Sequence, residues 1–99
     1  MEEIALRTQF STIVQPDEVR SVLNTALHRE ADLASARRTY FEHACRTFEQ
    51  RYRMSSDEFM RQFESGVLGD EAQCFDWYAA KRGLDLWERR YRILSGVTA

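Results

Sequence analysis

The residue types that most often carry out chemistry are few in this chain, and their spacing does not form a site. The sequence has two histidines and two cysteines among 99 residues. His43 and Cys45 are two positions apart, which places them on different faces of a helix, and His28 is isolated. No serine or cysteine has a local base that would activate it, and no glycine-rich phosphate loop is present. We therefore expect no metal site and no cofactor.

One spacing resembles a catalytic motif. Arg38 is followed by four residues and then by His43, which is similar to the Arg-x4–6-His motif of HEPN-type helical RNases. In that family the motif lies on a helix of a bundle, and two copies meet across a dimer to cut RNA. The resemblance implies that Arg38 would hold the phosphate and that His43 would transfer protons, with no metal involved. A dimeric RNase is therefore the alternative function.

Composition and charge limit the chain to one small domain. The formal charge of −2 gives no bulk attraction to membranes or nucleic acid, so contact with nucleic acid is expected only through a partner. Charge alternates by segment: −3 over residues 1–35, +3 over 36–54, −5 over 55–76 and +3 over 77–99. Two cysteines are too few for a disulfide scaffold, and neither a signal peptide nor a long apolar run occurs. We expect a cytoplasmic protein with reduced thiols.

The N-terminal half contains one long helical pattern behind an alternating segment. Apolar and polar residues alternate over 4–14, so residues 1–15 are expected to form a short strand or an arm that orders on a partner, separate from a single helical domain over 16–99. Pro16 and the two acidic residues after it favour the start of a helix predicted over 17–53. A break near residues 31–35 is the alternative.

The C-terminal half carries clear start and stop signals. Ser55 and Glu58 are spaced as a capping box for a short helix over 56–65, and Gly66 suits its left-handed end. Asp70 can cap a last helix, predicted over about 71–95 and stopped by Gly96. The prediction is an all-α, coiled-coil-like antiparallel helical bundle.

The last predicted helix has apolar residues on two opposite sides. A helix that packs on one core needs one apolar stripe, so a second stripe predicts burial on both sides or a side kept for a partner. Trp and Tyr concentrate binding energy at protein interfaces. Gly83 within this helix either permits close helix approach or is a tolerated surface glycine. One stripe has the spacing of a bundle seam and holds Trp77, Ala80, Leu84, Trp87, Tyr91 and Leu94; the other holds Phe75, Tyr78, Leu86 and Ile93.

Two charged residues interrupt the apolar stripe of the long helix. Glu30 and Arg37 lie near its centre, seven positions apart. Either both side chains extend to the edge of the stripe, or they form a buried pair that fixes the register between helices, within one chain or between two.

A run in the C-terminal half resembles a known group of proteins. Residues 52–59 read YRMSSDEF, residues 63–70 read FESGVLGD and residues 75–78 read FDWY. The run is similar to short prokaryotic helical proteins taken as antitoxin-like partners of small toxin-like proteins encoded beside them. The resemblance spans about residues 52–90 and implies a non-enzymatic binding protein of a toxin–antitoxin system. We expect a homodimer with a small protein partner encoded nearby, and the interface candidates are Trp77, Tyr78, Leu84, Trp87, Tyr91, Leu94, Glu30 and Arg37.

Overall fold

The computed structural model describes residues 15–69 and 71–98, and this part of the chain contains three helices and no strand. Helix α2 spans Pro16–Tyr52, α3 spans Ser56–Glu64 and α4 spans Ala72–Thr98. The predicted all-α fold is confirmed. The predicted arm or strand over residues 1–15 lies, but for its last residue, outside the described residues.

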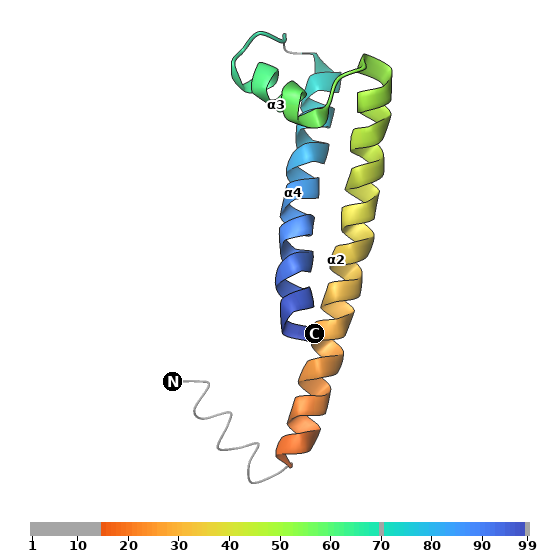
Figure 1. Ribbon diagram of the computed structural model, residues 1–99, viewed down its shortest axis with the longest axis vertical. Coiled ribbons are helices and arrows are strands. Elements are labelled where there is room, and N and C mark those ends of the chain that lie inside the picture. The colour runs from red at the N-terminus through yellow and green to blue at the C-terminus, as the bar shows by residue number, and fades with distance from the viewer. Residues whose placement is uncertain (1–14, 70, 99) are drawn as a thin grey trace.

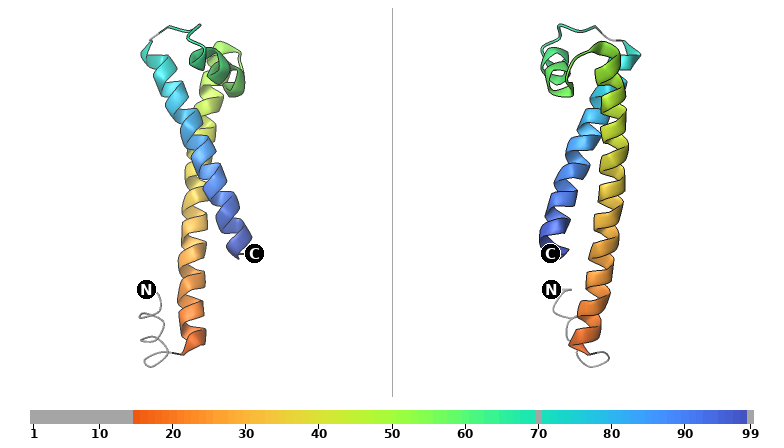
Figure 2. Two further views of the ribbon diagram at one scale, coloured as in Figure 1. Left: turned by 90° about the vertical axis from the view of Figure 1, so that its left-hand side faces the viewer. Right: turned by 45° about the vertical axis from the view of Figure 1, so that its right-hand side comes forward.

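The two long helices form an antiparallel hairpin, and α3 lies across one end of it. Figures 1 and 2 show α2 and α4 side by side in opposite directions, with α3 at the end where α2 finishes and α4 begins. The same views show the start of α2 extending beyond the C-terminal end of α4. The hairpin therefore sets which sides of α2 and α4 face outward.

Helix α2 is continuous over its 37 residues, so the alternative break near residues 31–35 does not occur. Its start matches the expected signals, with a proline in the first turn followed by Asp17 and Glu18. It ends where Arg53 adopts left-handed backbone angles (φ 52°, ψ 48°) and its N–H bonds to the carbonyl of Glu49. At about 1.5 Å per residue the helix is roughly 55 Å long.

Helix α3 lies within a residue of its predicted bounds, but only the Ser55 half of the predicted capping box forms. The Ser55 hydroxyl accepts a hydrogen bond from the backbone N–H of Glu58 at 3.1 Å. Gly66 has a φ of +80°, the left-handed conformation expected just after the helix. The Glu58 carboxylate bonds to Arg61 and Gln62, and these bonds hold the pKa of Glu58 below its usual value.

The predicted C-terminal boundary of α4 is wrong. The helix does not stop before Gly96 but continues to Thr98, whose hydroxyl donates a 2.9 Å hydrogen bond to the carbonyl of Leu94. A glycine inside a helix costs only about 1 kcal/mol relative to alanine, so it ends a helix only when the chain also turns there. The proposed cap at position 70 lies outside the described residues.

A close contact fixes the register of α2 against α4. A methyl group placed on Gly83 would lie 2.7 Å from the ring of Phe41, so Gly83 does permit close approach. One turn away, the Arg37 guanidinium lies 4.6 Å from the centre of the Trp87 ring. Continuing this register places Thr98 level with about Ala26. About ten residues at the start of α2 therefore extend past α4.

Candidate interaction surface

Trp77 is the centre of the core at the α3 end. It is 3% exposed, and its ring stacks on Phe59 with 4.1 Å between ring centres. Phe48 and Tyr52 of α2 stack on the same indole, each at 5.6 Å. Of the predicted interface candidates, Trp77 is thus enclosed by its own chain and acts as a core residue.

A chain of hydrogen bonds joins all three helices beside this indole. The Trp77 Nε1–H donates to the Ser56 hydroxyl at 2.9 Å, and that hydroxyl donates to Glu49 at 2.7 Å. The backbone N–H of Ser56 also donates to the same Glu49 oxygen, at 3.0 Å. Burial raises the pKa of the neighbouring Cys45 thiol, although a hydrogen bond with Ser56 opposes the shift. These polar groups position α3 and are too enclosed to form an open site.

Arginines cover the aromatic rings in the middle of the hairpin. The guanidinium groups of Arg37 and Arg90 lie 4.6 Å and 4.9 Å from the centre of the Trp87 ring. On Tyr91, Arg38 lies at 4.4 Å. Such stacks contribute about 0.5–1 kcal/mol each at exposed sites. Four of the predicted interface candidates are half-buried along this contact line: Leu84, Trp87, Tyr91 and Leu94.

The two stacks on Trp87 show that one flank of α2 and one flank of α4 border the same face of the hairpin. On α2, Arg37 lies one turn from both Leu33 and Tyr40. On α4, Arg90 lies one turn from Leu86. Because both arginines reach the same indole, the two flanks lie on one side of the molecule.

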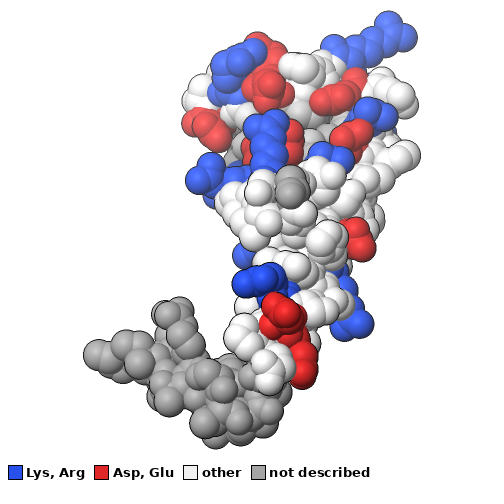
Figure 3. Space-filling model, turned by 60° about the horizontal axis from the view of Figure 1, so that its bottom comes forward, with Lys and Arg blue, Asp and Glu red and all other residues white. Residues whose placement is uncertain are grey.

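We call this side the bare face, because large apolar residues are exposed along it on both helices. Figure 3 looks from the end where α2 begins, and charged side chains of both signs lie together in the upper part of that view. The C-terminal part of this face matches the predicted second stripe of α4. Val22, Leu33 and Tyr40 of α2 belong to the apolar stripe predicted for the long helix, but the structure leaves them exposed on its flank. The bare face comprises Val22, Leu33 and Tyr40 of α2 and Leu86, Ile93 and Val97 of α4, which are between 39% and 69% exposed.

The opposite side of the hairpin is polar and carries α3. Lys81 of α4 pairs with Asp57 of α3 at 3.3 Å and with Asp85 at 2.9 Å. Burial lowers the pKa of Lys81, but the hydrogen bonds to these two carboxylates outweigh burial, so the pKa is raised above its ordinary value. Lys81 and Arg90 are nine positions apart, which is about 180° around the helix. Helix α3 therefore leaves the bare face uncovered.

Glu30 and Arg37, the proposed register pair, are both exposed. Arg37 is stacked on Trp87, and no ion pair joins it to Glu30 within the described chain. The two charges lie at the edge of the apolar stripe rather than inside a protomer. A pair between two chains stays a prediction.

Arg38 and His43, the candidate RNase residues, are not brought together within one chain. Arg38 is half-buried, with its guanidinium on Tyr91 and its Nε buried without a hydrogen-bond partner among the described residues. His43 is exposed. Five positions on a helix separate side chains by about 140°, so these two point to different sides of α2.

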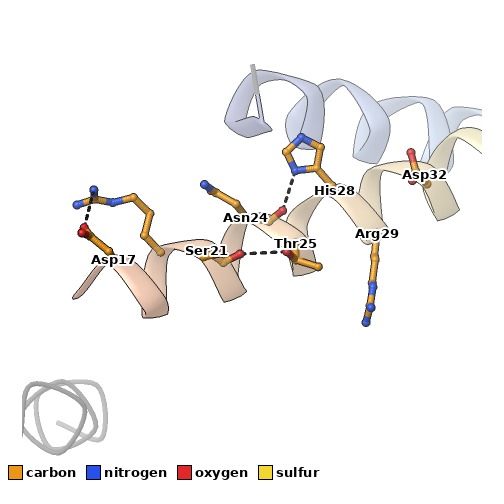
Figure 4. A pocket seen from close by; sticks show the side chains of 8 residues that line it. Asp17, Ser21, Asn24, Thr25, His28, Arg29 and Asp32 are labelled. Atoms are coloured by element: carbon orange, nitrogen blue, oxygen red, sulfur yellow. Dashed lines mark hydrogen bonds and ion pairs between the residues drawn. The ribbon is translucent and has the colours of Figure 1, made fainter. Parts of the chain in front are cut away.

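Two hollows lie outside the bare face. A groove of about 600 Å³ follows the polar side of α2, where Figure 4 shows side chains that bond to their own helix. There, the Thr25 hydroxyl donates to the backbone carbonyl of Ser21 at 3.1 Å, and His28 Nδ1 lies 2.7 Å from the backbone carbonyl oxygen of Asn24. A smaller hollow of about 210 Å³ lies at the α3 end between Tyr52, Met54, Phe59, Leu68 and Trp77. Neither hollow gathers a catalytic set.

Comparison with known proteins gives this chain no family. No protein-family model, curated protein or solved structure matches it. Within the described residues, no three histidine, cysteine or acidic side chains are grouped to hold a metal ion. No described helix is long and apolar enough to span a membrane.

Proposed function

We propose that this chain is a non-enzymatic protein–protein interaction module, and that α4 supplies the contact with its partner. The observation that supports this proposal is the exposure of Leu86, Ile93 and Val97 on the side of α4 turned away from the core. These residues follow one stripe with Arg90 between them, so an apolar strip lies beside a cation. Contiguous apolar strips on a small protein mark sites of protein contact.

The resemblance of residues 52–90 to antitoxin-like proteins supplies the class of partner. On this proposal the partner is a small toxin-type protein encoded nearby, in a prokaryotic toxin–antitoxin system, and the chain acts in the cytoplasm as a homodimer. Because Arg82, Arg89 and Arg90 lie along α4 and form no ion pair among the described residues, the partner surface should carry carboxylates.

Co-expression tests the proposal. The chain is co-expressed with the product of each adjacent reading frame, and the fraction that co-purifies is measured. Leu86→Glu places an unpaired charge in the apolar strip and should abolish capture of the partner. Arg92→Glu introduces the same residue on the polar side of α4 and should leave capture within about twofold. Equal capture by wild type and Leu86→Glu, or no capture of any adjacent product, would contradict the proposal.

A further inference from the structure

The exposed flank of α2 has symmetric spacing about Leu33. Val22 and Ala44 are each eleven positions from Leu33, and Ala26 and Tyr40 are each seven positions from it. All five share one side of the helix, because seven and eleven residues are close to whole numbers of turns. If a second α2 lay antiparallel with a twofold axis at Leu33, Val22 would face Ala44 of the second copy and Tyr40 would face Ala26. Large side chains would thus meet small ones on both sides of the axis, and Leu33 would meet its own copy at the axis.

Charge along α2 is also complementary to itself in this orientation. Residues 16–35 carry two arginines and four acidic residues, a net charge of −2. Residues 36–52 carry four arginines and two glutamates, a net charge of +2. Antiparallel pairing sets the acidic half of each copy on the basic half of the other, whereas parallel pairing sets like charges together.

The same axis gives Glu30 and Arg37 a role. Both are exposed on the edge of the flank, on opposite sides of Leu33. In this arrangement Arg37 of one copy would be level with Arg29 of the second copy, which lies on the other edge of the flank. The residue beside Arg37 on its own edge would be Glu30 of the second copy. Each dimer would contain this pair twice, which fixes the register by charge.

We infer that the α2 half of the bare face binds a second copy of this chain in antiparallel orientation, with the twofold axis at Leu33. The inference deepens the proposed function by assigning the α2 half to self-association and leaving the α4 half for the partner. Contact along α2 involves most of a helix roughly 55 Å long. Symmetric self-complementary contacts of this kind are the commonest basis of homodimers.

Cysteine crosslinking of the full-length chain tests the orientation. Leu33→Cys should form an intermolecular disulfide under mild oxidation, because the two copies of this position meet at the axis. Val22→Cys should not crosslink with itself but should crosslink when mixed with Ala44→Cys. Asn24→Cys on the polar side, and the wild type with Cys45 and Cys74, serve as uncrosslinked controls. Absence of the Leu33→Cys dimer, or self-crosslinking of Val22→Cys, would overturn the inference.

A charge exchange gives a second readout that does not depend on oxidation. Glu30→Arg and Arg37→Glu should each raise the dimer dissociation constant about tenfold, and the double variant should restore it. Circular dichroism checks that each variant keeps its helices. Loss of Leu33→Cys crosslinking with partner capture intact would reject self-pairing alone. Crosslinking with no capture of any adjacent product would reject the partner role alone. If the double variant did not restore the dimer dissociation constant, the Glu30–Arg37 pair would not set the register of the dimer.

Discussion

The indole nitrogen of Trp77 on α4 donates a 2.9 Å hydrogen bond to the hydroxyl of Ser56, the first residue of α3. The Ser56 hydroxyl in turn donates a 2.7 Å hydrogen bond to the carboxylate of Glu49 on α2. One buried hydroxyl thus links the three helices, and it holds α3 on the polar side of the hairpin. That placement is the reason why the opposite side remains bare.

Removal of this hydroxyl should destabilise the fold. Ser56→Ala leaves the buried indole N–H without its acceptor, and we expect a loss of about 1–3 kcal/mol in the free energy of unfolding. Ser55→Ala is the matched control, since it removes only the helix cap and should cost about 1 kcal/mol. Urea denaturation followed by circular dichroism measures both. Equal losses would mean that the bond to Trp77 contributes nothing beyond a cap.

Substitution of Gly83 tests the close approach of α2 and α4. An added methyl group would lie 2.7–2.8 Å from three ring atoms of Phe41, and overpacking of this kind costs about 1–3 kcal/mol. Alanine is otherwise the better helix former by about 1 kcal/mol, so Gly83→Ala should be destabilising only because of the clash. Phe41→Leu combined with Gly83→Ala should recover part of the loss. A stabilised Gly83→Ala in thermal unfolding would show that the ring can move aside.

The two thiols should differ in reactivity and in pH dependence. Burial raises the pKa of Cys45, so at pH 8 alkylation should modify Cys74 first and Cys45 only on unfolding. Below about pH 8.5, the ordinary thiol pKa, both states keep Cys45 protonated. Above it the unfolded thiol ionises first, so stability should fall as pH rises toward the folded pKa. Denaturation at pH 7.5 and pH 9.5 should show a smaller decrease in Cys45→Ala than in wild type.

The RNase alternative has a simple assay. Total RNA incubated with the purified protein should remain intact, because Arg38 is stacked on Tyr91 and His43 points to another side of α2. His43→Ala and wild type should give the same RNA profile on a denaturing gel. Cleavage by wild type that disappears in His43→Ala would support the alternative function, a HEPN-type RNase.

The elements were predictable where single residues set the backbone. Ser55, Glu58 and Gly66 act on neighbours in sequence, so they located α3 to within a residue. Gly96 misled the prediction because a glycine ends a helix only when the backbone turns there. The Glu49–Ser56 bonds and the arginine stacks on Trp87 join residues whose meeting depends on the folded hairpin. The apolar stripe on α4 could be read from its period, but the side of the hairpin covered by α3 could not.

The central claim is that protein covers the bare face in solution, and the mass of the full chain in light scattering tests it most directly. At low micromolar concentration we expect twice the 11.7 kDa of one chain. Tyr40→Glu should shift the mass to that of a monomer, while Asn24→Glu, on the polar side of α2, should not. An interface residue of this kind costs about 2 kcal/mol or more when lost, roughly a thirtyfold weaker dimer. A wild-type mass of 11.7 kDa at every concentration would contradict the account.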